Sequence, residues 1–485
     1  MKNNTNGFIL VGMVIMMLII ALTAMTMNRR AGMGDRMSAN HVLAVRTQFG
    51  GDAAIQYALW KLKNDPDFRT PPGGEPFSFD GLGYTLTVET SPLGGYEDVV
   101  RISAGPSGGT ATHTLGVRIA QPPSFTGVYL CDTGNACVRE IDPATGLITT
   151  LAGQGGTSGF AGDNGPADQA LLSKAVGVTG DLAGNIVIAD TENNCIRKVD
   201  TTGIITTIAG IPGIVGGYSG DNGPALAAKL NAPEAIDFDQ QGNIFIADTA
   251  NDCIRRIDAA TGIITTVAGI GTSSDYTGDG GPATAAEMKK PEGIAVDAMG
   301  NLFISDTGNH VIRRMNGVTG IITTIAGTGK SGFYGEGIPA LIAKLNTPGS
   351  ITEDDQNNLF IADTGNHIIR KIDAVTGIIA TVAGLPKGKG YTGDNIPVTL
   401  ARLNAPEGAL GMANGDIYIA DTANNRIRRV DGATGLIFTI AGNGSSGFSG
   451  DDGPAVNALL NAPMGIHHAP QGSGAPIITR VSEIY

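Results

Sequence analysis

The sequence predicts a mainly β protein: a six-bladed β-propeller closed by a C-terminal strand, preceded by a long N-terminal helix and a small antiparallel β head. Three observations lead to this prediction. Residues 8–27 carry no charged side chain, alternating Thr/Val/Ile segments follow between residues 84 and 120, and an Asp-Thr pair then recurs every 57 or 58 residues from Asp132 to Asp421. A regular period across hundreds of residues indicates a repeat architecture.

Length and composition limit the possible classes of protein. The chain has 485 residues, enough for two or three domains, with 72 Gly and only 16% charged residues. This profile favours tight turns and short strands. The net charge of −13 disfavours nucleic acid as a partner and favours cations or basic surfaces.

The amino-terminal apolar segment, Phe8 to Met27, is long enough to cross a bilayer as a helix. A cleaved secretory signal is the rival interpretation, although its apolar core is usually shorter. Lys2 precedes the segment, and Arg29 and Arg30 follow it. Taken alone, this distribution of positive charge would place the carboxyl side in the cytoplasm.

The leader "MKNNTNG" followed by "FILVG" resembles a type IV prepilin. The resemblance implies cleavage after Gly7 by a prepilin peptidase and methylation of Phe8. The family usually has Glu at the fifth mature position, where this sequence has Gly12, but some minor pilins and tip pseudopilins lack this Glu. Residues 34–62, "GDRMSANHVLAVRTQFGGDAAIQYALWKL", are similar to the helical region of minor pilins. Pilins present their heads outside the inner membrane, and this outweighs the argument from Arg29 and Arg30.

A breaker-rich stretch, "KNDPDFRTPPGGEP", ends the predicted helix. The runs "YTLTVET", "DVVRISA" and "TLGVRIA" then predict a small antiparallel sheet. The expected organisation is a leader at 1–7, a transmembrane and pilin-like helix at 8–64, a β head at 65–121, a linker at 122–127 and a propeller at 125–485.

One repeat shows what a repeating unit contains. Residues 291–327 read "PEGIAVDAMGNLFISDTGNHVIRRMNGVTGIITTIAG", four short strands rich in Ile, Val, Thr and Phe with turns between them. Four antiparallel strands per unit is the blade of a β-propeller. The remaining residues of each repeat form a Gly-rich crossing to the next blade, with a short helical turn.

The segments "GNHV" at Gly308 and "GNHI" at Gly365 resemble the NHL-repeat signature. The resemblance covers six copies, and it is specific for fold more than for function. Residues 125–132 enter at a second strand, so residues 461–470 are expected to supply the missing first strand and close six blades. The tail, residues 475–485, is left as an unassigned extra strand.

The turns between second and third strands share one face of a propeller with the crossings. This candidate binding face collects six turn carboxylates, whose simplest role is to cap their own hairpins: Asp132, Asp190, Asp248, Asp306, Asp363 and Asp421. Calcium is the one metal considered, because loop carboxylates suit it, and no other cofactor is expected. Its candidate ligands are the crossing acids Asp163, Asp221, Asp279, Glu336, Asp394 and Asp451.

An Arg follows each turn Asp seven residues later: Arg139, Arg197, Arg255, Arg313, Arg370 and Arg428. Because blades stack face to face, we expect these side chains to be partly buried and paired with blade carboxylates or carbonyls. Among the four Cys, Cys131 and Cys137 flank one turn, and we expect them to form a disulfide in an oxidising envelope. His310 and His367 hold one repeat position, which indicates a turn role. No asymmetric cluster of axis-facing His or acidic residues is expected.

These observations predict a non-enzymatic, minor-pilin-like surface protein that presents its propeller for adhesion or partner binding at a pilus or pseudopilus tip. Its partners would be pilus subunits, through the amino-terminal helix, and an unknown protein or glycan on the propeller face. The precursor would lie in a bacterial inner membrane with the propeller extracytoplasmic, and the mature protein could be extracellular on a pilus. Two alternatives are a membrane-anchored propeller enzyme, such as a metal-dependent lyase or lactonase, and an anchored sensor or scaffold without a pilus.

Overall fold

The computed structural model describes residues 75–79, 82–90, 99–106, 113–120, 127–181, 183–271, 276–468 and 477–483. The predicted helix at 8–64 and the processing pair Gly7 and Phe8 lie outside the described residues. Within the described part of the chain, no helix is long and apolar enough to cross a membrane. The chain divides into two compact units, one of residues 1–121 with 475–485 and the other of residues 122–474.

The smaller unit contains one antiparallel sheet of five strands. Their order is β1 (Glu75–Phe79), β2 (Leu82–Thr90), β3 (Val99–Pro106), β4 (His113–Ala120) and β34 (Ile477–Glu483). The predicted antiparallel sheet is confirmed. The boundaries predicted from the sequence place the tail within the propeller at 125–485. This boundary is wrong, because β34 pairs with β4 of the smaller sheet. An alternating strand pattern does not state which edge the strand will join, so the sequence left this open.

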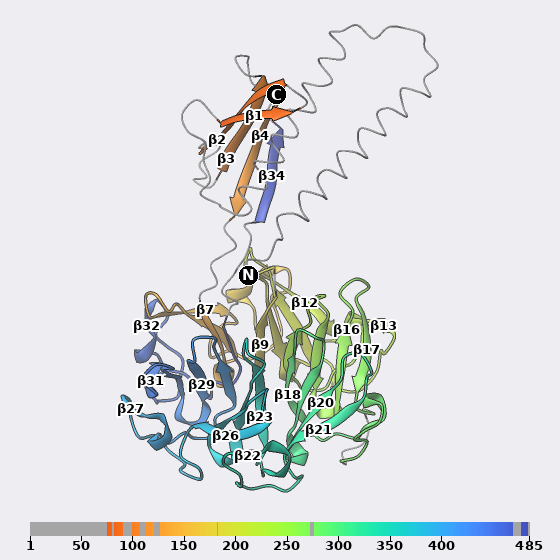
Figure 1. The fold of residues 1–485 in the computed structure, drawn as a ribbon, viewed down its shortest axis with the longest axis vertical. Helices are drawn as coiled ribbons and strands as arrows, with labels where there is room; N and C mark the ends of the chain where they lie inside the picture. Colours follow the sequence, from red (N-terminus) through yellow and green to blue (C-terminus); the bar gives the residue numbers. More distant parts are fainter. Residues whose placement is uncertain are drawn as a thin grey trace. The chain divides into compact units, whose positions relative to one another are not determined.

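The larger unit is a propeller of six blades (Figure 1). Each blade is a meander in which the first strand lies innermost. The first strands are β9 (Ala175–Gly180), β14 (Pro233–Phe238), β18 (Pro291–Val296), β23 (Pro348–Glu353), β28 (Gly408–Gly411) and β33 (Ile466–His468). The second strands are β5 (Val128–Asp132), β10 (Ile186–Asp190), β15 (Ile244–Asp248), β19 (Leu302–Asp306), β24 (Leu359–Asp363) and β29 (Ile417–Asp421).

The two outer strands of each blade follow in sequence order. The third strands are β6 (Cys137–Ile141), β11 (Cys195–Val199), β16 (Cys253–Ile257), β20 (Val311–Met315), β25 (Ile368–Ile372) and β30 (Arg426–Val430). The fourth strands are β7 (Leu147–Ala152), β12 (Ile204–Gly210), β17 (Ile263–Ala268), β21 (Ile322–Ala326), β26 (Ile378–Ala383) and β31 (Leu436–Ala441).

The crossings add an element that the sequence did not predict. In five blades a two-residue strand of the incoming crossing pairs outside the fourth strand: β8 (Gly165–Pro166), β13 (Gly223–Pro224), β22 (Ile338–Pro339), β27 (Ile396–Pro397) and β32 (Gly453–Pro454). In the remaining blade Pro282 makes a single bridge to Ile321. Each crossing therefore passes along the outer edge of its blade before it reaches the axis.

Short 3-10 helices fill the turns and crossings. The helical turns of the crossings are η2 (Ala167–Gln169), η4 (Ala225–Ala227), η6 (Ala283–Ala285), η8 (Ala340–Ile342), η10 (Val398–Leu400) and η12 (Ala455–Asn457). Those between second and third strands are η1 (Thr133–Asn135), η3 (Thr191–Asn193), η5 (Thr249–Asn251), η7 (Thr307–Asn309), η9 (Thr364–Asn366) and η11 (Thr422–Asn424).

Ring closure follows the predicted scheme. Strand β33 is the innermost strand of the blade that β5 opens, and the paired residues are Ile466 with Leu130, His467 with Tyr129 and His468 with Val128. The blades are buried on both faces, since side chains of adjacent blades share one core, as Val187 does with Ile246. Each fully buried aliphatic side chain of this kind stabilises the ring by about 1.5–3 kcal/mol.

Candidate functional site

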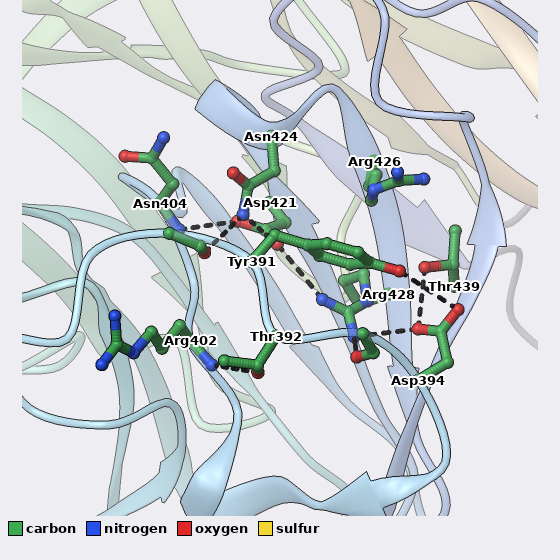
Figure 2. A network of polar contacts seen from close by, with 12 residues as sticks. Tyr391, Thr392, Asp394, Arg402, Asn404, Asp421, Asn424, Arg426, Arg428 and Thr439 are labelled. Carbon is green, nitrogen blue, oxygen red and sulfur yellow. Dashed lines mark hydrogen bonds and ion pairs between the residues drawn. The ribbon is translucent and has the colours of Figure 1, made fainter.

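The six turn aspartates, predicted to line a binding face, are fully buried. Figure 2 shows one of them, Asp421, between Asn424 and Arg428. One carboxylate oxygen of Asp421 accepts the backbone N–H of Asn404 at 2.8 Å. The other accepts the amide of Asn424 at 2.9 Å and faces Arg428 at 3.4 Å. This carboxylate has no surface left for a ligand.

The same arrangement recurs in all six blades. Each turn Asp accepts a backbone N–H from the crossing that enters its own blade, at 2.7 or 2.8 Å. Burial raises the pKa of Asp421 to about 6, against the lowering effect of Asn424, the Asn404 N–H and Arg428. These contacts and this burial give the turn Asp a structural role in its own blade.

The predicted pairing of the six arginines is confirmed. Each Arg is fully buried and lies between its turn Asp and the acid of the incoming crossing. Arg197, for example, contacts Asp163 at 2.7 Å and Asp190 at 3.4 Å. Its guanidinium also stacks on the ring of Phe160 at 4.7 Å, and aromatic rings hold this place in the other blades.

This pairing also argues against calcium at the crossing acids. Asp163 contacts Arg197 with one oxygen and accepts the hydroxyl of Thr207 at 2.7 Å with the other. Asp394 accepts hydrogen bonds from both Arg428 and Thr439 with one of its oxygens (Figure 2). Among the described residues, no three His, Cys, Asp or Glu side chains are grouped closely enough to hold a metal ion.

One blade departs from the pattern. Glu336 stands where the other crossings have Asp, and its carboxylate lies 4.0 Å from Arg370, against 2.5–3.0 Å in the other five blades. Nη1 of Arg370 has no hydrogen-bond partner, unlike Nη1 of the other five arginines, and lies 3.8 Å from Asp363. The extra methylene of Glu336 displaces the carboxylate from its usual position, so this is the weakest of the six networks.

The Thr of each Asp-Thr pair connects two blades. Its hydroxyl donates to a backbone carbonyl of the next blade, at 2.6–2.8 Å; the acceptor is the first residue of the innermost strand in four blades and lies two or three residues before that strand in the other two. Thr249, for example, donates to the carbonyl of Pro291 at 2.8 Å. In the Asp-Thr pair, the Asp thus stabilises its own hairpin and the Thr binds the neighbouring blade.

The predicted disulfide between Cys131 and Cys137 is wrong. All four cysteines are free and buried. Cys131 pairs across the hairpin with Val138, while Cys137 pairs with Asp132. Because successive strand residues point to opposite faces of a sheet, the two sulfur atoms lie on opposite faces of the blade.

His310 and His367 have the turn role that their repeat position predicts. Each is the left-handed residue that ends its turn, with φ of 58° and 61°. Their Nδ1 atoms accept the backbone N–H of Thr347 and Ala405 in the next crossing, at 3.0 and 2.9 Å. In other blades Asn194 and Asp252 make the equivalent contact.

A cavity of about 220 Å³ lies among the innermost strands, around the axis. Its rim is formed by the second residue of each first-strand segment, on the face that carries the Asp-Thr turns. These six equivalent residues are Val176, Glu234, Glu292, Gly349, Glu407 and Met464. Three of them are half-buried glutamates, and Lys174 also lines the cavity, so charge is distributed unevenly around the axis.

Local backbone structure directs these glutamates to the axis. Glu234 and Glu292 sit in β-bulges that follow Pro233 and Pro291, and a bulge re-aims its extra side chain. The carboxylate of Glu407 lies directly against Gly349: a Cβ added to Gly349 would be only 2.8 Å from Oε2 of Glu407. That oxygen also accepts a long hydrogen bond of 3.4 Å from Thr364.

The three carboxyls share a low-dielectric site and repel one another. Burial raises the pKa of Glu292 to about 8, and the charges of Glu234 and Glu407 raise it too, against Lys290 and Thr307. Burial and the charge of Glu234 raise the pKa of Glu407 to about 7, against Thr364. Burial raises the pKa of Glu234, and Lys174 and Lys290 oppose this rise.

The expectation that no acidic cluster faces the axis was therefore wrong. The signal that could have found it is a break in the repeat. The polar residues that hold each blade together, the Asp-Thr pair and the Arg seven residues after the Asp, are the same in all six copies, but the second residue of the inner-strand segment is Glu in three blades only. A structural role would apply to every blade, so variation at one repeat position marks residues that the ring itself does not require.

The fold defines the larger unit as a six-bladed β-propeller, and its repeats are similar to those of NHL-repeat proteins. A family model, the teneurin NHL domain, matches residues 270–333. The chain is 30% identical over 250 residues to the chloroplastic protein Suppressor of Quenching 1 of Arabidopsis thaliana, which covers 49% of this chain and 23% of that protein.

Two other relatives are similar over longer stretches. Teneurin-4 of Mus musculus is 27% identical over 329 residues, 60% of this chain and 11% of that protein. NHL repeat-containing protein 2 of Gallus gallus is 27% identical over 373 residues, 67% of this chain and 50% of that protein. In each case the similar region is half or less of the relative's length.

Two solved structures are similar to the chain at low sequence identity. A protein of unknown function from Bacteroides thetaiotaomicron is 15% identical, with a TM-score of 0.49, over 82% of this chain and 85% of that chain. Virginiamycin B lyase from Staphylococcus aureus is 17% identical, with a TM-score of 0.37, over 67% of this chain and 87% of that chain.

Proposed function

We propose that the propeller is a binding module that takes a positively charged group of a partner, such as a Lys or Arg side chain, at the axial cavity. The observation that carries the proposal is the asymmetric rim of Glu234, Glu292 and Glu407. Three carboxyls in one small cavity cost free energy when they are all ionised, and a bound cation offsets that cost.

The size of the cavity favours a single side-chain head group. Cavities for drug-sized ligands have volumes of roughly 300–1,000 Å³, and this one measures about 220 Å³. An ammonium or guanidinium group fits such a space, where the charges of Glu234 and Glu407 already act on Glu292. A partner protein with an exposed basic residue, or a glycan with an amino sugar, supplies this chemistry, and the chain's charge of −13 attracts both.

The raised pKa values make the proposed binding depend on pH. At pH 6 the carboxyl of Glu292, with a pKa of about 8, and that of Glu407, with a pKa of about 7, are largely protonated. A cation binds the ionised forms and releases these protons. Affinity should therefore rise as the pH rises from 6 to 8.

The test uses tetralysine and tetraglutamate peptides as probes of the full chain by calorimetry. We expect tetralysine alone to bind, more tightly at pH 8 than at pH 6. The triple variant Glu234→Gln, Glu292→Gln and Glu407→Gln should lose at least about tenfold in affinity. The matched control removes three exposed acids, Asp168→Asn, Asp355→Asn and Asp452→Asn, and so changes the net charge equally. Equal losses in the two triple variants would refute the axial site.

We also propose that the protein is displayed as a minor-pilin-like subunit, inserted in a bacterial inner membrane as a precursor and extracytoplasmic in its propeller. Support comes from the leader that ends at Gly7, the apolar segment after it and the minor-pilin-like residues 34–62. Its partners there would be subunits of a pilus or pseudopilus. Mass spectrometry of the mature amino terminus should find methylated Phe8. An intact Met1 would instead favour an anchored sensor or scaffold without a pilus.

A second candidate function is acid–base catalysis of the lyase or lactonase type. It is favoured by one observation, the pKa of about 8 for Glu292 in a cavity, because a group that titrates near neutral pH suits proton transfer. Lactone turnover that is abolished by Glu292→Gln, and retained in the triple control variant, would support this function. Its sensitivity to a chelator would test whether a metal takes part.

A further inference from the structure

The chain passes between its two units twice. It leaves the smaller sheet after β4, runs through residues 121–127 and enters the propeller at β5. It then leaves the propeller after β33, runs through residues 469–476 and rejoins the smaller sheet as β34. The propeller is therefore an insertion between two adjacent strands of the smaller sheet.

In each unit, the residue at the end of one connection pairs with the residue at the end of the other connection. In the smaller sheet, Ala120 at the end of β4 pairs with Ile477 at the start of β34. In the propeller, Val128 at the start of β5 pairs with His468 at the end of β33. Two connections of nearly equal length, seven and eight residues, thus join one antiparallel pair to another.

The closing strand of the ring is its shortest first strand. Strand β33 has three residues and pairs with β5 through only these three. The backbone around it adds hydrogen bonds from Cys131 to Gly465 at 2.9 Å and from Met464 to Cys131 at 3.1 Å. Blades elsewhere pair their first two strands over four or more residues. A pull on β5 alone would shear this ladder.

We propose that β34 acts as a clasp, a second attachment of the propeller to the smaller sheet. With both attachments in place, a force that pulls the two units apart does not act on β5 alone, and the three-residue pairing of β5 with β33 is protected. When both connections carry the pull, β5 and β33 are drawn at neighbouring ends and in one direction. Their shared hydrogen bonds then experience little relative shear. With β34 released, the whole pull acts on β5 and draws it past β33.

The proposal concerns attachment and does not depend on what the axial cavity binds. It gives the tail a function that keeps the propeller closed when a bound partner and the rest of the chain are pulled apart. It also predicts an order of events under increasing force. Strand β34 leaves the smaller sheet first, and the ring opens only afterwards.

The test cuts one connection in the folded protein. A protease site is placed within residues 469–476 of the full chain, and single molecules are held at constant force between an amino-terminal handle and a handle at Val318→Cys, a residue 89% exposed. Cutting after folding should make the ring open at least about tenfold faster, which corresponds to about 1.4 kcal/mol. The uncut molecule is the matched control. An unchanged opening rate after cutting would overturn the proposal.

Two proline variants test whether β34 pairs with β4 in the intact chain. Of two neighbouring residues in an edge strand, one directs its N–H to the adjacent strand and the other directs it away. We therefore expect only one of Ile478→Pro and Thr479→Pro to speed ring opening and to lose hydrogen-exchange protection in residues 113–120. If both variants, or neither, had these effects, the clasp would be rejected.

Discussion

Substitution of one buried arginine tests the repeated network most directly. Arg197→Met keeps much of the side-chain volume but leaves Asp190, which is fully buried, without its counter-charge. Removing one partner of a buried ion pair costs about 3–5 kcal/mol. At about 2 °C per kcal/mol for a domain of this size, the Tm of the propeller should fall by about 6–10 °C.

The six blades supply their own comparison. Arg197 meets its crossing acid at 2.7 Å, whereas Arg370 meets Glu336 at 4.0 Å. With an effective dielectric constant of about 20, these separations differ by about 2 kcal/mol of attraction. Solvent around the two acids, 32% and 48% exposed, reduces the difference to about 1 kcal/mol. Arg370→Met should therefore destabilise the protein less than Arg197→Met.

Thermal unfolding followed by far-ultraviolet circular dichroism measures both variants. Fluorescence is unsuitable, because the single tryptophan, Trp60, lies outside the propeller. Lys198→Met, next in sequence and partly exposed, is the control and should change the stability by less than about 0.5 kcal/mol. If Arg197→Met unfolded at the same temperature as this control, the arginine network would not stabilise the ring.

Three further outcomes are expected. Glu336→Asp should restore the short contact to Arg370 found in the other blades and raise stability by about 0.5–1 kcal/mol; a lower Tm would show that this crossing has adapted to Glu. The raised pKa of Glu292, about 8 when folded and about 4.3 when unfolded, contributes stability that is complete below about pH 4 and is lost as the pH rises through 8. Glu292→Gln should therefore flatten the fall in Tm between pH 5 and pH 8 and stabilise the protein at pH 8 by about 1–2 kcal/mol, and a steeper fall would contradict the burial argument. Thiol titration should find no reactive cysteine in the native protein and four after unfolding without reductant; two missing thiols would restore the bridge between Cys131 and Cys137.

The sequence was sufficient for the architecture of the propeller. The short strands on either side of Asp363 and its five equivalents predicted the four-stranded blade. The first repeat lacks its first strand, and this predicted that residues 461–470 close the ring. The burial and pairing of the arginines could also be predicted, because a side chain such as Arg370 within a stacked sheet needs a counter-charge. The particular partner acids could not, because they depend on how each crossing passes along the outer edge of its blade.

The candidate site was harder to predict for a physical reason. Comparing repeats draws attention to what all six copies share, and in this chain the shared polar residues are structural. Glu234, Glu292 and Glu407 are visible only as deviations, and bulges rather than strict alternation direct two of them to the axis. The pairing of β34 was equally hidden, because its partner β4 lies more than 350 residues earlier in the sequence.

The contacts of the Asp-Thr pair have a consequence for how such a ring changes in evolution. Each Asp binds the crossing that enters its own blade, and each Thr donates to a backbone carbonyl at or just before the first strand of the blade that follows. One 58-residue copy therefore carries the complementary halves of two identical junctions. A duplication or deletion of one whole copy leaves every junction with both of its halves. The number of blades can thus change in a single genetic step, limited only by whether the closed ring still packs around its axis.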